Sequence, residues 1–179
     1  AISVKRYANA MASGVPAGSS FYTLADMASR LTVDAANDRM LTTSYDAEGR
    51  KTAVQQNLVN TYTYAGGWVQ ASPTNTYTYN ALGQVVRETL IGRAANGATV
   101  ITGPSTTFYY DALGRRVASV DAMGHYTRFE YNALGQMARQ VEYATVVNSW
   151  AEGAAPATPA AHADDRATAY DYDQLGRAI

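Results

Sequence analysis

Histidine side chains are the first place to look for chemistry, and the chain has only two. His125 directly follows Gly124, while His162 lies two residues before the adjacent carboxylates Asp164 and Asp165. Imidazole and carboxylate groups ligate metals, so one interpretation of the second group is a metal site. The other is a solvated loop, and a polar residue such as His125 is ordinary after a turn glycine. We expect structural roles for both histidines, because a catalytic triad needs three groups within hydrogen-bond reach and nothing local supplies them.

A pair of carboxylates lies near the end of the sequence. Asp171 and Asp173 flank Tyr172, so in a strand both would point to the same face. Paired carboxylates can exchange protons or bind calcium. However, Asp173 also fits a turn motif that recurs along the chain, and no glycine-bearing calcium loop surrounds it. We therefore expect a structural role for Asp173 and predict no enzyme activity, cofactor or metal. An enzymatic interpretation would require a pocket that gathers His125 or His162 with two carboxylates.

Composition limits the partners. The net charge is -1 and there is no cysteine, so disulfides and thiolate metal sites are excluded. There is no basic surplus to attract nucleic acid or an anionic membrane. No apolar run approaches the roughly 18 residues of a membrane helix. Fourteen tyrosines against three phenylalanines favour half-buried sheet surfaces, where a ring packs and its hydroxyl stays near water.

A short phrase returns five times: Tyr, then Asp or Asn, two residues, Gly, then Arg or Gln. A half-repeat, Asp121 to Gly124, lies between the third and fourth copies. Such self-similarity indicates a repeat architecture. The predicted structural motif residues are Tyr45, Asp46, Gly49, Arg50, Tyr79, Asn80, Gly83, Gln84, Tyr110, Asp111, Gly114, Arg115, Asp121, Gly124, Tyr131, Asn132, Gly135, Gln136, Tyr172, Asp173, Gly176 and Arg177.

The spacing of the motif predicts hairpins. Asp or Asn at the first turn position bonds the backbone two residues on, and Gly at the fourth accepts a positive φ, which together favour a type I turn with a bulge. Between residues 106 and 143 the turns recur every ten or eleven residues, which leaves ordinary strand lengths between them. The fold class predicted is all-β, an antiparallel meander that advances one hairpin per repeat.

The intervals between copies divide the chain. We predict a divergent N-terminal segment or degenerate repeat over 1–29 and a repeat segment over 30–179. Loop-like insertions are expected near 65–75, 92–104 and 144–168, where Gly, Pro, Ser and Ala gather, with a hairpin arm at Thr99–Ile101 inside the second. The chain begins without Met and has repeats near both ends, so we interpret it as a fragment of a larger protein.

The two tryptophans, Trp68 and Trp150, lie in or beside insertions. We expect each ring to pin its loop onto the sheet; the alternative is an aromatic that contacts a partner. Upstream, residues 33–38 resemble a decayed half-repeat turn, and residues 22–30 fit either a further decayed unit or a short helix. Residues 8–20 resemble a loop.

The residue after each turn glycine forms a potential ladder down one side of the sheet. It alternates between Arg and Gln at Arg50, Gln84, Arg115, Gln136 and Arg177. One interpretation is a polar stripe that binds glycans or cargo. The other, which we favour, is that these side chains pair with nearby Asp or Glu.

The motif from Tyr110 to Arg115, with a second Gly at 124 and the next Tyr at 131, resembles the YD repeat of the rearrangement-hotspot (Rhs) family. The same repeats occur in the B and C subunits of insecticidal toxin complexes and in teneurins. The resemblance covers roughly residues 30–179 and departs from the pattern in its insertions, in Glu48 instead of Leu, and in Asn at 80 and 132.

The resemblance implies a β-sheet spiral that forms a hollow shell, of which this chain would be an arc. In bacterial members the shell commonly encloses a toxic C-terminal polypeptide, and in teneurins it belongs to an extracellular adhesion protein. The implied partners are the remainder of the shell and the enclosed polypeptide, and the implied location is secreted or cell-surface. The family's Asp-Pro cleavage motif is absent from this sequence.

Two functions follow from these features. The first is a non-catalytic structural segment of a shell that encapsulates a C-terminal toxin or effector. The alternative is a cell-surface adhesion or carbohydrate-binding repeat module, which exposed aromatic patches on the insertions would favour. Exposed edge strands also predict self-association of the isolated chain. Neither function involves nucleic acid or membrane insertion.

Overall fold

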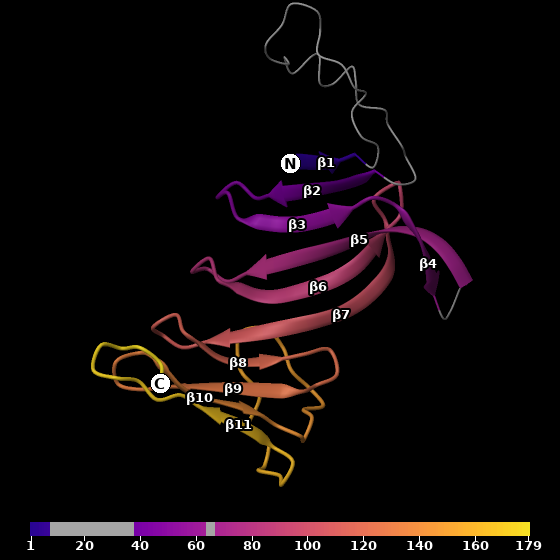
Figure 1. Ribbon diagram of the computed structural model, residues 1–179. Helices are drawn as coiled ribbons and strands as arrows, with labels where there is room; N and C mark the ends of the chain where they lie inside the picture. The colour runs from indigo at the N-terminus through magenta and orange to yellow at the C-terminus, as the bar shows by residue number, and fades with distance from the viewer. Residues whose placement is uncertain (8–37, 64–66) are drawn as a thin grey trace, which may run out of the picture. The chain divides into compact units, whose positions relative to one another are not determined.

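The computed structural model describes residues 1–7, 38–63 and 67–179. Within them all regular structure is β-strand (Figure 1). The expected decayed repeats at 22–30 and 33–37 and the expected loop at 8–20 lie outside the described residues. No helix among the described residues is long and apolar enough to cross a membrane. The strands are β1 (Ile2–Arg6), β2 (Arg39–Tyr45), β3 (Lys51–Gln56), β4 (Val59–Thr63), β5 (Gly67–Tyr79), β6 (Val85–Arg93), β7 (Thr99–Tyr110), β8 (Arg116–Val120), β9 (Tyr126–Tyr131), β10 (Met137–Glu142) and β11 (Arg166–Ala169).

Strand order follows chain order. The sheet runs β1-β2-β3-β5-β6-β7-β8-β9-β10-β11, with β4 paired to β5 beside this path, and it does not close on itself. Neighbours such as β8 and β9 or β9 and β10 are antiparallel. The predicted all-β antiparallel meander is therefore confirmed. It arises because each short polar turn returns the chain beside the strand it has just left.

The strands belong to two compact units. The first comprises Ala1–Thr74 and Gly92–Ile101, and the second comprises Asn75–Ile91 and Thr102–Ile179. In the first unit, β1, β2 and β3 are consecutive neighbours, and Lys5 forms an ion pair of 3.0 Å with the buried Asp38 just before β2.

The second unit holds the main apolar cluster. Tyr109, Ala118, Val120 and Tyr126 are buried together on β7, β8 and β9. Part of the segment after β10, which includes Val147 and Trp150, packs against them. Residues 143–165 contain no strand. The prediction that Trp150 pins its loop onto the sheet is thereby confirmed.

The loop conformation expected near 65–75 and 92–104 is wrong at residues 67–75 and 102–104, whereas the arm expected at Thr99–Ile101 lies within β7. Residues 67–75 belong to β5 and residues 99–104 belong to β7. Gly103 explains part of the error: a Cβ there would lie 2.6 Å from the Leu90 carbonyl oxygen, so this glycine permits a close approach of two strands. Local composition suggested a loop, and cross-strand pairing overrides it.

Candidate functional site

The repeated turn is the best-defined constellation of polar groups in the chain. In the third copy, Asp111 Oδ1 accepts hydrogen bonds from the backbone N–H groups of Leu113 (3.0 Å) and Arg115 (2.9 Å). Gly114 donates its N–H to the Asp111 carbonyl at 3.0 Å and has a φ of 80°. These are the bonds of a type I turn closed by a glycine bulge, as the spacing predicts.

The residue after the glycine then closes onto the first turn residue. Arg115 Nε donates to Asp111 Oδ2 at 2.8 Å, whereas in the second copy Asn80 Nδ2 donates to Gln84 Oε1 at 2.9 Å. The pairing is matched throughout, because each Asp accompanies Arg and each Asn accompanies Gln. The pairs are Asp46–Arg50, Asn80–Gln84, Asp111–Arg115, Asn132–Gln136 and Asp173–Arg177. We call these five turns, with their preceding tyrosines, the turn ladder.

The aspartates of the turn ladder are held as carboxylates. A hydrogen bond from the Arg50 side chain is the largest cause that lowers the pKa of Asp46. For Asp111 and Asp173, the backbone N–H groups of Arg115 and Arg177 are the largest cause that lowers the pKa. The turn therefore favours the charged carboxylate, which accepts several donors at once.

Consecutive turns are joined through the motif tyrosine. The hydroxyl of Tyr110 donates to the Val85 carbonyl at 2.8 Å, just beyond the preceding turn. The hydroxyls of Tyr131 and Tyr172 donate in the same way, to Arg116 at 2.8 Å and to Met137 at 2.9 Å. Each of these tyrosines thus bonds the residue that follows the Arg or Gln of the turn before it.

The Gln and Arg side chains add a second set of links. Gln84 Nε2 donates to the Gly114 carbonyl of the next turn at 2.8 Å, and Gln136 Nε2 donates to Gly176 at 3.4 Å. The Arg115 guanidinium lies 4.7 Å from the centre of the Tyr131 ring, a cation–π distance. These bonds link each of the turns at 79–84, 110–115, 131–136 and 172–177 to its neighbour in the second unit.

The comparison with protein families agrees with this geometry. The family model described as RHS Repeat matches residues 110–145, the stretch that holds the third and fourth turns and the half-repeat. Residues 110–145 therefore match an RHS repeat. No curated protein matches the chain. The resemblance inferred from the RHS motif is confirmed over that stretch, and the outer turns of the ladder share its hydrogen bonds.

The half-repeat between the third and fourth turns closes with histidine in place of Arg or Gln. Asp121 Oδ1 accepts the N–H groups of Met123 and His125, and Asp121 Oδ2 lies 3.0 Å from His125 Nδ1. Burial tends to raise the pKa of Asp121, but the hydrogen bonds from His125 and Met123 outweigh it and lower the pKa. His125 is thus a variant of the turn-closing residue.

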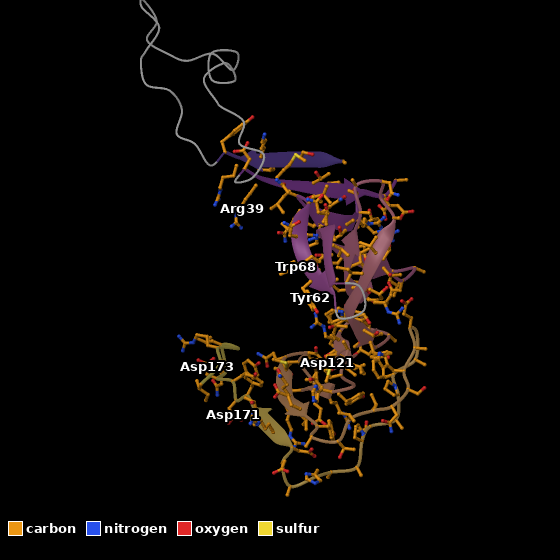
Figure 2. All side chains as sticks on the ribbon, turned by 90° about the vertical axis from the view of Figure 1, so that its right-hand side faces the viewer. Arg39, Tyr62, Trp68, Asp121, Asp171 and Asp173 are labelled. Carbon is orange, nitrogen blue, oxygen red and sulfur yellow. The ribbon has the colours of Figure 1, made fainter. Side chains whose placement is uncertain are left out.

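Among the other residues singled out for chemistry, Asp164 lines a pocket together with Asp121 and His125, and Asp171 and Asp173 are not among its lining residues. Asp173 bonds Arg177 within its own turn, whereas the Asp171 side chain is exposed. His162 donates its backbone N–H to Asp165 Oδ2, and Asp165 Oδ1 accepts the Ala144 N–H, so this group closes a loop. Figure 2 shows Asp121 and Asp171 on separate strands or turns. No group of three metal-binding side chains occurs among the described residues.

Two features of the turn ladder were not predicted from the sequence. The first is the hydroxyl bond of each motif tyrosine, which joins positions far apart in the chain. The second is a row of exposed leucines at the turn tips, namely Leu82, Leu113, Leu134 and Leu175. The fourfold occurrence of Leu before the turn glycine was the available signal for this row. Glu48 occupies the same place in the first turn.

Proposed function

We propose that this chain is a non-catalytic structural segment of an Rhs-type shell that encloses a C-terminal toxin or effector. The observation that supports the proposal most is the turn ladder, in which Tyr110, Tyr131 and Tyr172 each bond the repeat before them. Because each repeat bonds its neighbour in the same way, further repeats can extend the sheet with the same contacts. The polar side chains of the turn ladder bond one another within the sheet, which suits a structural role.

The ends of the strand order support a role within a larger sheet. Among the described residues, β1 and β11 each have one paired neighbour, so each offers an edge to further strands. In the parent protein these edges would pair with the remainder of the shell. In the isolated chain they would favour self-association, because unpaired backbone groups seek partners.

The parent protein would be secreted or displayed at the bacterial surface, with the enclosed polypeptide as its principal partner. The alternative function, adhesion or carbohydrate binding, would require a surface outside the turn ladder. The ladder's Asp, Asn, Arg and Gln side chains already bond one another.

Limited proteolysis of the full-length protein tests encapsulation. The sample would be digested natively and after unfolding, and the polypeptide C-terminal to the repeats would be followed by mass spectrometry. We expect that polypeptide to survive native digestion, to be separable only by denaturation, and to be degraded once the shell is unfolded. Degradation in the native sample at the rate seen for the C-terminal polypeptide expressed alone would contradict the proposal.

A further inference from the structure

The hairpin formed by β4 and β5 carries an aromatic and amide face that the turn ladder does not use. Tyr62 and Trp68 are directly opposite each other in the pairing of these strands, and Asn60 and Gln70 are the next opposite pair. Side chains two residues apart on a strand share a face, so all four lie together. Thr61 and Val69 form the pair between them and belong to the other face.

This face is open to solvent. Tyr62 is 62% exposed and Trp68 is 73% exposed, and both amide side chains are classed as exposed as well. The two rings are 5.7 Å apart at an interplanar angle of 74°, an edge-to-face arrangement. In this arrangement one ring meets the other with its edge, so neither flat surface of that ring is covered by its neighbour. Figure 2 shows the two rings side by side.

The two strands that build this face, β4 and β5, contain no charged residue. No Asp, Glu, Lys, Arg or His occurs between Lys51 and Arg87, although charged residues make up 16% of the chain. A ligand attracted by charge would find no counter-charge on the strands that build this face. The available interactions are ring stacking and neutral hydrogen bonds, since amides both donate and accept.

We propose that the face formed by Asn60, Tyr62, Trp68 and Gln70 binds a neutral saccharide chain. A pyranose ring presents an apolar surface of C–H groups, which stacks on an exposed aromatic ring, and a rim of hydroxyls, which suits the amides of Asn and Gln. Binding sites for small molecules combine aromatic rings with a few polar groups that fix orientation in this way. Exposed apolar surface of this kind often marks a place where a protein binds a ligand or partner.

The saccharide fits this face better than a second copy of the chain does. An interface core between copies excludes water and favours apolar contacts, whereas here each ring has an exposed amide beside it on the same strand. The proposal does not depend on encapsulation, because the four residues lie on β4 and β5 and no ladder residue takes part. A shell wall with this face directed outward would attach its parent to glycans.

Binding can be measured on the full chain by titration with neutral oligosaccharides. The probes are cellohexaose, maltohexaose and chitohexaose, with a galacturonic acid hexamer as the anionic comparison, followed by tryptophan fluorescence and saturation-transfer NMR. We expect at least one neutral probe to bind and the anionic probe to bind more weakly. Trp68→Ala should weaken binding about tenfold or more, as expected for an aromatic at the centre of a contact, and Gln70→Ala should weaken it less. Leu82→Ala, which changes an exposed apolar residue on a ladder turn, should bind like the unaltered chain.

Three outcomes would overturn the proposal. The first is that none of the neutral probes binds. The second is equal binding by the Trp68→Ala variant with its unfolding temperature unchanged. The third is a dimer in sedimentation that Trp68→Ala dissociates, which would assign the face to contacts between copies.

Discussion

Trp150 and Trp68 occupy opposite environments although both lie in insertions between repeats. Trp150 is half-buried and packs against the cluster of Tyr109, Ala118, Val120 and Tyr126, whereas Trp68 is 73% exposed. The prediction that each ring would pin its loop onto the sheet is correct for Trp150 and wrong for Trp68. The residue type alone therefore does not decide whether an aromatic side chain in an insertion packs onto the sheet or stays exposed.

Backbone anchoring accounts for the difference. The segment before Trp150 is tied to the sheet by Tyr143 N–H to the Tyr126 carbonyl (3.0 Å) and by Val147 N–H to the Gly124 carbonyl (2.9 Å). The Tyr109 hydroxyl also donates to the Ala151 carbonyl at 3.0 Å. Trp68 instead pairs with Tyr62 of β4 in the same hairpin, and its ring meets the Tyr62 ring edge to face.

The largest expected effect comes from Gly124→Ala. Gly124 has a φ of 85°, and an added Cβ would collide with the Val147 carbonyl oxygen, so the anchored segment would have to move. Gly135→Ala is the matched control, since Gly135 has a φ of 80° and nothing within 4 Å of the added Cβ. Gly135→Ala should lower the free energy of unfolding by about 1–2 kcal/mol, because alanine is strained in a left-handed backbone conformation. Gly124→Ala should lower the free energy of unfolding in urea by clearly more than Gly135→Ala does. Equal losses for the two variants would contradict the role given to the anchored segment.

Truncating the two tryptophans sharpens the same contrast. Trp150→Ala should lower the free energy of unfolding by about 2–3 kcal/mol, below the value for a fully buried ring because Trp150 is only half-buried. Trp68→Ala should change it by less than about 0.5 kcal/mol, because surface substitutions rarely do more. Thermal and urea unfolding followed by circular dichroism would measure both. A similar loss for both variants would show that Trp68 also supports the fold.

Removing one hydroxyl tests the links between turns. Tyr110→Phe deletes the bond to the Val85 carbonyl and should cost about 1 kcal/mol, the net value of an ordinary hydrogen bond. Tyr62→Phe is the control on the open hairpin and should leave stability unchanged. If Tyr110→Phe also left the free energy of unfolding unchanged in chemical denaturation, the tyrosine hydroxyl bonds between turns would not stabilise the fold.

Acidification should destabilise the turns that contain Asp more than the turns that contain Asn. The pKa of Asp111 is lowered in the folded chain, so its contribution is present above its ordinary pKa and is lost as pH falls through the lowered value. Loss therefore begins below about pH 4, the ordinary range for Asp. Asp111→Asn combined with Arg115→Gln copies the neutral pair found at Asn80 and Gln84. This double variant should fold and lose part of the acid sensitivity in a pH series of melting temperatures, and an unchanged slope would contradict the assignment.

The smallest effect is expected at the turn tips. Leu113 is 77% exposed, so Leu113→Ser should change the free energy of unfolding of the isolated chain by less than about 0.5 kcal/mol. A substantial loss would mean that the leucine row is already covered in the chain as it stands.

Turn chemistry was predictable because it is local. Asp or Asn followed by Gly three residues later fixes the hydrogen bonds of each turn, and the spacing between turns fixes strand length and the antiparallel meander. The prediction that the residue after the glycine pairs with nearby Asp or Glu is correct for Arg50, Arg115 and Arg177. The two glutamines pair with Asn instead, and this matched exchange was not recognised. That match was present in the sequence, since Asn80 and Asn132 are each followed by Gln four residues later.

Long-range contacts were not predictable. Tyr172 bonds Met137 and Tyr109 bonds Ala151 across many residues, so no local pattern specifies them. Strand formation at residues 67–75 was obscured for a similar reason. Ser72, Pro73 and Thr74 suggest a loop in isolation, while pairing within the sheet decides their conformation.

Quenching of single-tryptophan variants by acrylamide tests the central contrast most directly. The Trp150→Phe variant retains only Trp68, and the Trp68→Phe variant retains only Trp150. We predict long-wavelength emission and strong quenching for Trp68, with shorter-wavelength emission and clearly weaker quenching for Trp150. Equal quenching of the two tryptophans in the folded variants would contradict the account that one insertion is anchored to the sheet while the other presents its aromatic face to a ligand.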